Sequence, residues 1–409
     1  MIGSNMSTHP PFPSPLAIHW QHDPSVCYLN HGSFGACPTT VLHAQQRLRN
    51  RMEAEAVKFF VEDLWPLMDG ARAALGRFVN ARPQDIAPVP NATVAVATVL
   101  HNLVREGVLG AGDEVIAPDH EYPACLNNLR DVCGRVGAKV VGVEIPFPIS
   151  SPDQVVDAVL SKGSVRTKAA LISHATSPSA LVLPLERIVP ELEKRGIRTI
   201  IDGAHGAGFI KGLDLTKLGA SYYTSNCHKW LCAPKGSAFL WVREDRKKNF
   251  RPMVLSNFAE RAKPGREQFL TEFDFIGTND VTPFLAIPAA IDFLGSLLPG
   301  GWPAVFDHNR NLNLQARELL CRELNIEPPA PESMLASMCT LIFSKQPPPA
   351  TPSPLGYHDP IQEALIHKWR IQVPIWSVAG KCRTLRISPQ VYNSIGQYEY
   401  LARAMKAEL

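Results

Sequence analysis

Lys229 is the residue whose surroundings most favour reactive chemistry. It lies in the stretch 224–230, among hydroxyl, amide and imidazole side chains and directly before a tryptophan. A lysine that is partly removed from water has a lowered pKa and becomes a usable amine nucleophile. Most lysines lie on solvated loops, but here the neighbouring positions are apolar or hydrogen-bonding rather than charged. The stretch therefore favours a reactive amine.

A carboxylate occupies a second position suited to chemistry. The apolar run 199–201 ends in Asp202, and Gly203, Ala204 and His205 follow. Open α/β sheets bind ligands at the carboxyl ends of their strands, where a carboxylate can pair with a cationic ring nitrogen or a metal ion. An aspartate at a strand end also serves as a helix cap or a turn residue. Both explanations stay open for Asp202 considered by itself.

Asp202 and Lys229 together indicate one cofactor. They are 27 residues apart, and each follows a predicted strand. Pyridoxal phosphate needs a lysine that forms the Schiff base and an acid that pairs with the pyridinium nitrogen, which keeps the ring an electron sink. The pair therefore predicts a pyridoxal-phosphate enzyme.

Short apolar strands alternate with helices around these two residues. Strands are predicted at 114–117, 139–143, 169–173, 199–202, 221–224 and 238–242. Helices are predicted at 39–78, 126–136, 154–160 and 185–195. Apolar strands that alternate with helices are typical of a mostly parallel sheet covered on both faces. The fold class is therefore α/β.

The pattern changes after Pro283, and we expect a smaller α+β domain there. The expected helices are 285–298, 309–323, 360–368 and 397–408, and the expected strands are 339–343, 370–374 and 384–388. Residues 345–360 contain six prolines and are expected to form a stiff loop. The predicted organisation is an N-terminal arm (1–25), a large cofactor-binding domain (26–283) and a small C-terminal domain (284–409).

Composition excludes several classes of partner. The 409 residues carry 41 Lys and Arg against 38 Asp and Glu, a formal charge of +3. That balance does not suit a protein attracted by charge to nucleic acid or membranes. Nine cysteines without a CxxC pair indicate neither a disulfide framework nor a zinc site, so no metal is expected. With no apolar run of membrane length and no signal-peptide pattern, we expect a cytoplasmic location.

The motifs around Asp202 and Lys229 resemble those of the class V aminotransferase family of fold type I pyridoxal-phosphate enzymes. Within that family the chain is most similar to the isopenicillin N epimerase-like branch, over about residues 26–395. The resemblance implies a large domain with a mostly parallel, seven-stranded sheet and a smaller C-terminal α+β domain. It also implies a homodimer with shared active sites.

The resemblance assigns a set of residues to cofactor binding. These are Asn91, Ala92, Thr93, Tyr122, Ser177, Asp202, His205, Ser225, His228, Lys229 and Thr278. Asn91, Ala92 and Thr93 form the phosphate-binding turn, where free N–H groups and the helix dipole favour an anion. Ser225 and His228 add phosphate contacts, and Thr278 reaches the phosphate of the neighbouring subunit.

Two contacts to the cofactor ring follow from the same resemblance. Tyr122 takes the position of the aromatic side chain that lies over the ring. Many family members have an asparagine before the aspartate strand that contacts the ring hydroxyl, whereas this chain has Ser177 in the turn 176–180. Either Ser177 makes this contact with a shorter reach, or His205 makes it alone.

The substrate-binding residues are also implied by the resemblance. Asn30, His31, Gly32 and Ser33 belong to the opening motif, within residues 26–40, that lines the substrate mouth. Arg386 matches the arginine that holds the substrate α-carboxylate through two parallel hydrogen bonds. Arg383 is the alternative, since either arginine could instead pair with a surface acid.

The nearest branch implies an amino-acid substrate and epimerisation or racemisation at Cα, with Lys229 moving the proton. The alternatives are a C–S lyase or other β-eliminating enzyme, a cysteine desulfurase-like enzyme, an aminotransferase and a non-catalytic cofactor carrier. Desulfurases need a reactive cysteine on a mobile loop, whereas Cys339 lies in an apolar strand and Cys382 lies in no recognisable desulfurase loop. The sequence does not show the second proton donor that inversion requires.

Overall fold

The computed structural model describes residues 10–347 and 359–409, and a seven-stranded sheet is at its centre. The strand order is β2-β8-β7-β6-β5-β3-β4. The strands are β2 (Ile86–Val89), β3 (Glu114–Pro118), β4 (Lys139–Val143), β5 (Thr167–Ser173), β6 (Arg198–Asp202), β7 (Tyr222–Asn226) and β8 (Ala238–Val242). β8 runs antiparallel to both of its neighbours, and the neighbours from β7 to β4 are parallel. The predicted mostly parallel α/β sheet is therefore confirmed.

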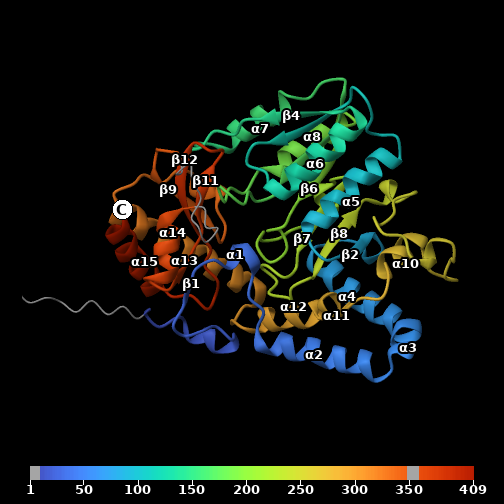
Figure 1. Cartoon of the computed structure of the whole chain (residues 1–409), viewed down its shortest axis with the longest axis horizontal. Helices are drawn as coiled ribbons and strands as arrows, with labels where there is room; N and C mark the ends of the chain where they lie inside the picture. Colours follow the sequence, from blue (N-terminus) through green and yellow to red (C-terminus); the bar gives the residue numbers. More distant parts are fainter. Residues whose placement is uncertain (1–9, 348–358) are drawn as a thin grey trace, which may run out of the picture.

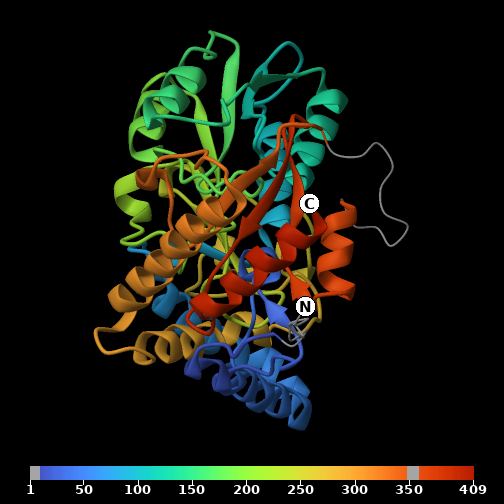
Figure 2. The ribbon, with the colours of Figure 1, turned by 90° about the vertical axis from the view of Figure 1, so that its left-hand side faces the viewer.

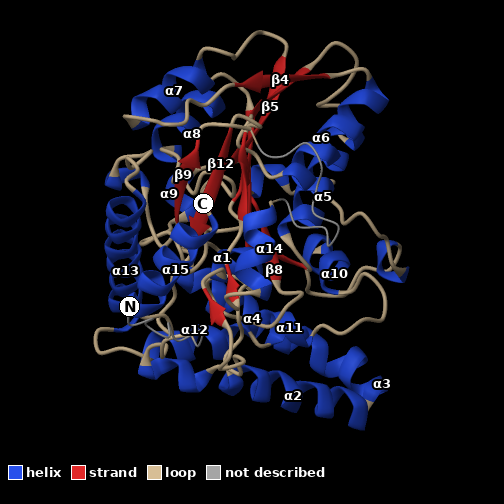
Figure 3. Cartoon of the chain, turned by 60° about the vertical axis from the view of Figure 1, so that its left-hand side comes forward, coloured by secondary structure: helices blue, strands red, loops and turns tan. Residues whose placement is uncertain are grey.

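Helices cover both faces of this sheet. Figure 3 shows α5 (Ala92–Arg105) and α6 (Pro123–Val136) on one side, and α7 (Pro152–Leu160) and α8 (Leu185–Lys194) on the other. Successive strand residues point to opposite faces. Ile200 accordingly packs in the cluster with α5 and α6, whereas Ile201 packs in the cluster with α7 and α8. Burial on both faces explains the apolar runs of the inner strands, such as Ala169–Ile172 in β5.

The C-terminal part forms a second body, orange and red in Figure 2. Its antiparallel sheet has the order β11-β12-β9. The elements are β9 (Cys339–Ser344), β11 (Ile375–Val378), β12 (Cys382–Ile387), α13 (Gly301–Leu324), α14 (Pro360–His367) and α15 (Ile395–Glu408). In the predicted proline-rich loop 345–360, residues 348–358 lie outside the described residues.

The N-terminal segment packs on both bodies (Figure 1). In the predicted arm, residues 1–9 lie outside the described residues, and Pro15–His19 form a 3₁₀ helix. Trp20 is buried, with its ring 5.0 Å from that of Tyr392. β1 (Cys27–Tyr28) pairs in parallel with β10 (Ile371–Gln372), and α1 (His31–Phe34) follows. The start of the chain is thus tied to its C-terminal part.

The segment predicted to be helical at 39–78 is helical almost throughout, but it is not one continuous helix. The structure has α2 (Thr39–Ala54), α3 (Ala56–Lys58) and α4 (Leu64–Phe78), with a π-helical turn at Phe59–Asp63. The backbone leaves the helical region at Glu55, where φ is −143° and ψ is 64°. Apolar spacing continues across this break, so spacing could not reveal it.

Three other predicted elements also differ from the structure. The predicted helix 285–298 is two helices, α11 (Thr282–Leu285) and α12 (Ile287–Ser296), so the predicted domain boundary falls inside α11. The predicted strand 370–374 shrinks to β10, because Arg370 has a positive φ of 55°. α13 begins eight residues before the predicted start at 309.

The remaining elements are α9 (Leu215–Leu218), α10 (Gln268–Asp274) and short 3₁₀ helices at Pro83–Asp85, Glu244–Arg246, Asn257–Ala259 and Glu332–Met334. Within the described ranges, no single helix is long and apolar enough to cross a membrane. The segments Thr282–Ser296 and Gly301–Leu324 have the length and composition of a membrane span only when they are taken together, and the chain bends by 73° between them.

Candidate active site

A cavity of about 180 Å³ lies at the carboxyl ends of β5, β6 and β7. This is the edge where open α/β sheets bind ligands. It is lined by Ser33, Phe34, Asn91, Ala92, Thr93, Tyr122, Cys125, Ser173, Ala175, Ser177, Asp202, Ala204, His205, Asn226, His228 and Lys229. Most of the residues predicted to bind the cofactor are therefore side by side.

Lys229 presents its amine to this cavity from the loop after β7. The pKa of Lys229 is lowered to about 8, first by burial and then by the charge of Arg386, against the opposing charge of Asp202. Its backbone carbonyl accepts a hydrogen bond from His31 Nε2 at 3.0 Å. A substantial fraction of neutral amine near neutral pH suits a nucleophile and a proton carrier.

Asp202 ends β6, at the same edge of the sheet as the loop that carries Lys229. Its Oδ1 accepts a hydrogen bond from the Ala204 N–H at 2.9 Å, and its Oδ2 accepts one from Cys125 Sγ at 3.1 Å. Among the described residues no Lys, Arg or His lies within ion-pair distance of this carboxylate. The carboxylate is therefore available to a cationic ring nitrogen.

His205 has its protonation state set by its neighbours. Nδ1 accepts a hydrogen bond from Trp230 Nε1 at 3.1 Å, so the ring proton is on Nε2. Burial lowers the pKa of His205 well below its usual value, which keeps the ring neutral. Nε2 lies 3.4 Å from Lys229 Nζ. A neutral donor beside the lysine fits the predicted contact to a ring hydroxyl.

The N-terminus of α5 forms the anion end of the cavity. Asn91 caps this helix, with its side chain accepting from the Val94 N–H at 3.0 Å. Asn226 Oδ1 accepts from the Ala92 N–H at 2.9 Å. The first turn of a helix attracts anions through its N–H groups and dipole. Together with Thr93, which also lines the cavity, this end fits a phosphate group.

His228 lies at the same end. Its Nδ1 donates to the Ser237 carbonyl at 2.9 Å, and burial lowers the pKa of the ring to about 4. Nε2 is therefore an acceptor in this structure. It becomes a donor to phosphate when a bound anion raises the pKa of the ring.

The structure does not bring Ser225 to the cavity. The Ser225 hydroxyl is fully buried and accepts from the Ala207 N–H at 2.9 Å, while the next residue, Asn226, lines the cavity. Alternate residues of a strand point to opposite sides, and Ser225 lies on the wrong side for a phosphate contact. The predicted role of Ser225 therefore does not fit the structure.

The opening motif is only partly at the cavity. Ser33 lines it, whereas Asn30, His31 and Gly32 lie behind Ser33. His31 is buried between Tyr392, 2.7 Å from its Nδ1, and the Lys229 carbonyl. A Cβ on Gly32 would lie 2.6 Å from Met338 Sδ. These three residues support the lysine loop and the arginine rather than the cavity surface.

Arg386 also lies behind the cavity wall, fully buried. It donates to the Ser177 carbonyl and hydroxyl oxygens at 2.9 and 3.1 Å, and to Ser33 Oγ at 2.9 Å and Asn30 Oδ1 at 3.2 Å. Burial lowers its pKa to about 9, and no acid pairs with it in the described part of the chain. The guanidinium also lies over the Trp376 ring, at 4.4 Å from the ring centroid. A buried guanidinium whose hydrogen bonds go only to neutral oxygens is suited to receive a carboxylate.

The alternative arginine has a different environment. Arg383 forms two hydrogen bonds of 2.7 Å with the Asp359 carboxylate and lies over the Phe343 ring. Its charge is already paired outside the cavity. Thr278, the residue predicted to reach a neighbouring subunit, is exposed and does not line the cavity of its own chain.

Several cavity residues were not predicted. Asn226, Cys125 and Ser173 line the cavity, and Glu121 lies buried behind Ser173. Phe34 also lines it, but Phe34 belongs to the predicted opening motif within residues 26–40. Because side chains alternate along β7, the sequence could have shown that Asn226 and Ser225 point to opposite sides and that only one of them faces the cavity. Nothing in the sequence signals that Cys125, one turn into α6, contacts the carboxylate of Asp202.

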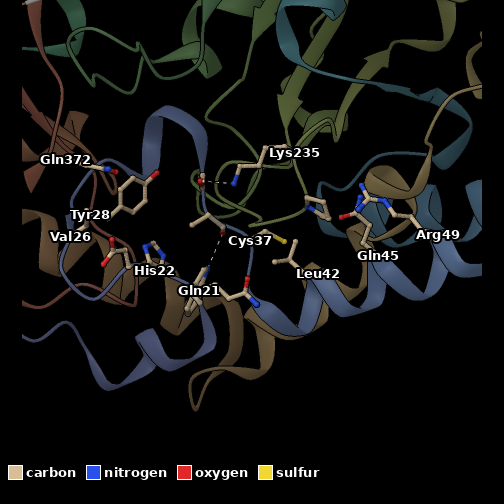
Figure 4. A pocket seen from close by; sticks show the side chains of 15 residues that line it. Gln21, His22, Val26, Tyr28, Cys37, Leu42, Gln45, Arg49, Lys235 and Gln372 are labelled. Atoms are coloured by element: carbon tan, nitrogen blue, oxygen red, sulfur yellow. Dashed lines mark hydrogen bonds between the residues drawn. The ribbon is translucent and has the colours of Figure 1, made fainter. Parts of the chain in front are cut away.

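A second, larger cavity lies apart from these residues. It measures about 570 Å³ and is lined by none of the residues assigned individually to the cofactor or substrate, although Val26, Tyr28, Gly35, Ala36 and Cys37 of the predicted segment 26–40 line it. Figure 4 shows Tyr28 and Gln372 at one end, Gln45 and Arg49 from α2 at the other, and Lys235 between them. Lys235 Nζ donates to the Gly35 carbonyl at 3.1 Å, on the segment that separates the two cavities. The larger cavity is thus not the catalytic one.

The sheet and the smaller cavity define a class of protein. A lysine amine, a strand-end carboxylate and a helix N-terminus meet in one place, which is the donor set for pyridoxal phosphate on a fold type I scaffold. When bound, this cofactor withdraws electrons from Cα of an amine substrate. No three His, Cys, Asp or Glu residues of the described chain group as metal ligands.

The chain belongs to the Aminotransferase class-V family, whose profile matches residues 28–349. The predicted family and cofactor are thereby confirmed. Isopenicillin N epimerase of Amycolatopsis lactamdurans is 34% identical, with 94% of this chain and 95% of that one covered. A probable chloroplastic L-cysteine desulfhydrase of Arabidopsis thaliana is 28% identical, with 97% and 86% covered.

Solved structures show the same fold. The cysteine desulfurase CsdA of Escherichia coli superposes with a TM-score of 0.74 at 19% identity, covering 95% of this chain and 96% of that one. The cystine C–S lyase C-DES, in complex with cysteine persulfide, has a TM-score of 0.71 at 20% identity, covering 92% and 96%. The chain is a pyridoxal-phosphate enzyme, and its relatives catalyse different reactions.

Proposed function

We propose that this enzyme acts at Cα of an amino acid and inverts its configuration, as an epimerase or racemase. The observation that carries the substrate class is Arg386, a buried guanidinium with no acid partner, just behind the cavity that holds the Lys229 amine. A substrate carboxylate bound to Arg386 places Cα near Lys229. The similarity to isopenicillin N epimerase supports inversion.

Inversion requires proton carriers on both faces of Cα, and we assign the second to Tyr122. The other titratable side chains of the cavity are already engaged in hydrogen bonds. Cys125 is hydrogen-bonded to Asp202, His205 to Trp230, and His228 to the Ser237 carbonyl. Tyr122 also lines the cavity and is 45% exposed, and its hydroxyl makes no hydrogen bond within the described part of the chain. A phenol can donate and accept a proton.

The experiment that tests this function follows solvent deuterium into Cα of a panel of amino acids. Wild type is expected to incorporate deuterium with change of configuration and with the carbon skeleton intact. Tyr122→Phe is expected to keep exchange on one enantiomer and to lose inversion, because the ring remains and only the hydroxyl is removed. Ser33→Ala serves as the matched variant, since loss of a contact to Arg386 should lower exchange and inversion together.

The second candidate is a C–S lyase, which the similarity to L-cysteine desulfhydrases favours. In that case a cysteine or cysteine conjugate would yield pyruvate, ammonia and a thiol or sulfide, with no inversion of any amino acid tested. That outcome would replace the epimerase proposal. Pyruvate is not expected from amino acids without a leaving group on Cβ.

A desulfurase-like persulfide route receives no support from the cysteines. Burial raises the pKa of the Cys339 thiol in β9 and of the Cys382 thiol in β12. Burial and the Asp202 carboxylate raise the pKa of Cys125, the only thiol among the cavity-lining residues. Thiols of raised pKa are poor nucleophiles.

We also propose a cytoplasmic location for the enzyme. All nine cysteines are unpaired, which supports this proposal.

We also propose that the active enzyme is a homodimer in which Thr278 completes the partner's phosphate site. Thr278 is exposed beside Asp280, which forms an ion pair of 2.9 Å with Arg49. The exposed Phe34 and Ile276 side chains would be covered in such a dimer.

Thr278→Ala is therefore expected to weaken cofactor retention. The loss of one hydrogen bond to a charged phosphate costs about 1.5–3 kcal/mol. Dialysis followed by the visible absorbance of the remaining cofactor measures the loss. Thr216→Ala, which removes an exposed hydroxyl bonded to the Asn80 carbonyl, should leave retention unchanged. Full activity of a monomer at high dilution would contradict the proposal.

A further inference from the structure

Glu121 is a buried acid next to the cofactor cavity with no role in the chemistry described so far. Its side chain is 2% exposed. Oε1 is 2.7 Å from the Ser173 amide nitrogen, and Oε2 is 2.6 Å from Ser173 Oγ. Across the described chain no Lys, Arg or His forms an ion pair with this carboxyl group. Ser173 lines the cavity, and Glu121 lies directly behind it.

A second carboxyl group lies close by. Ser173 and Asp202 are register partners on the parallel strands β5 and β6. Neither carboxyl group forms an ion pair within the described chain, although Lys229 acts on Asp202 at longer range. Two charged carboxylates are costly in one buried place, so the one without a cation nearby holds a proton. Asp202 accepts from Ala204 and Cys125 and faces the cationic ring nitrogen of the cofactor. Burial, with a smaller contribution from Asp202, raises the pKa of Glu121 to about 8.

We propose that Glu121 is a positioning residue that stays protonated in the working enzyme and, through Ser173, sets the hydrogen bonding and charge at the floor of the cofactor cavity. This inference depends on the cofactor and not on the reaction class.

The proton on Glu121 fixes the direction of the hydrogen bonds. The Ser173 N–H can only donate, so Oε1 is the carbonyl oxygen of the acid. The protonated Oε2 then donates to Ser173 Oγ, and the Ser173 hydroxyl proton turns toward the cavity. Ser173 thereby becomes a donor to whatever binds there. Since Glu121 carries no charge, Asp202 is the single anion on the floor and pairs with the ring nitrogen.

Glu121→Gln tests the proposal because glutamine has the same shape and is permanently neutral. Its carbonyl can accept from the Ser173 N–H, and its amide can donate to Ser173 Oγ. At pH 7 the full-length holoenzyme should keep its cofactor, and ¹⁵N NMR of ring-labelled cofactor should show an unchanged pyridine nitrogen shift.

Infrared spectra of the holoenzyme provide the direct readout. Wild type should show a carboxylic-acid C=O band that disappears as the pH is raised through about 8, and Glu121→Gln should lack this band. Ser173→Ala should keep the band but require a higher pH to lose it. Once Glu121 ionises, the Ser173 hydroxyl turns to donate to the carboxylate, and this bond lowers the pKa of Glu121 in the wild type. This second variant tests the proposal even where Glu121→Gln folds poorly.

Two results would overturn the inference. One is the absence, at pH 7, of any carboxylic-acid band that responds to Glu121→Gln or Ser173→Ala. The other is loss of the cofactor or of ring-nitrogen protonation in a folded Glu121→Gln protein at pH 7, which would mean that an ionised Glu121 is required. Neither result would bear on whether the enzyme is an epimerase or a lyase, so the two proposals fail separately.

Discussion

Lys229→Ala is expected to abolish hydrogen exchange at Cα while leaving weak cofactor binding through the phosphate. The amine is the group that both forms the covalent link to the cofactor and carries the proton. Wild type should be yellow, and borohydride should fix the cofactor on one peptide that contains Lys229. The variant should lose this label and its exchange activity, measured by deuterium incorporation.

The pH dependence of cofactor uptake gives the same prediction a second measurement. Only the neutral amine of Lys229 attacks, and its pKa is about 8. The rate of cofactor capture by apoenzyme should therefore rise with pH through about 8 and then level off. Lys235→Arg is the matched control, because Lys235 lies on the larger cavity and bonds the Gly35 carbonyl. A label on Lys235, or exchange by Lys229→Ala, would show that the site is misassigned.

Arg386→Lys is expected to lower kcat/KM strongly while the cofactor stays bound. An ammonium group cannot reproduce the two parallel hydrogen bonds of a guanidinium to a carboxylate. The substrate then loses the orientation that places its Cα–H bond perpendicular to the cofactor ring. Misplacement by about 1 Å costs on the order of 100-fold in rate. Steady-state kinetics with visible absorbance of the cofactor measure both quantities.

Arg383→Lys provides the comparison for this variant. Arg383 lies on the same strand, β12, but its charge is paired with Asp359. We expect Arg383→Lys to affect thermal stability and to leave kcat/KM close to that of wild type. Equal losses in the two variants would indicate a general effect on β12 rather than a carboxylate site at Arg386.

Sequence patterns predicted the central sheet well because most of its strands carry an apolar run, which is fully buried in β8 and kept even in the partly exposed edge strand β4. The predicted strands at 139–143 and 238–242 coincide with β4 and β8. β2 was missed, since it is a short edge strand that contains Pro88 and carries little pattern of its own. The break at Glu55 was missed because it depends on the backbone conformation of one residue and not on which residues are apolar.

The candidate site was predictable where one residue acts through its type and its position after a strand. Asp202 and Lys229 are of this kind, and the structure places both on the cavity. Contacts between distant segments were not predictable. The Ser33 and Ser177 side chains cover Arg386 from residues more than 200 positions away, and only the folded chain shows that they do.

The pairing of β1 with β10 has a consequence for the order in which the protein forms during synthesis. The Leu29 N–H donates to the Gln372 carbonyl, and the Ser388 N–H donates to the Leu29 carbonyl. The segment before α1 is therefore held by residues that are synthesised after the whole central sheet. His31 follows Leu29 by two residues, and its Nε2 forms a hydrogen bond with the Lys229 carbonyl. The ribosome therefore releases a chain whose sheet and Asp202 can already be in place. The lysine loop gains its His31 contact, and Arg386 its Asn30 and Ser33 contacts, only after the C-terminal strands emerge and capture the N-terminal segment.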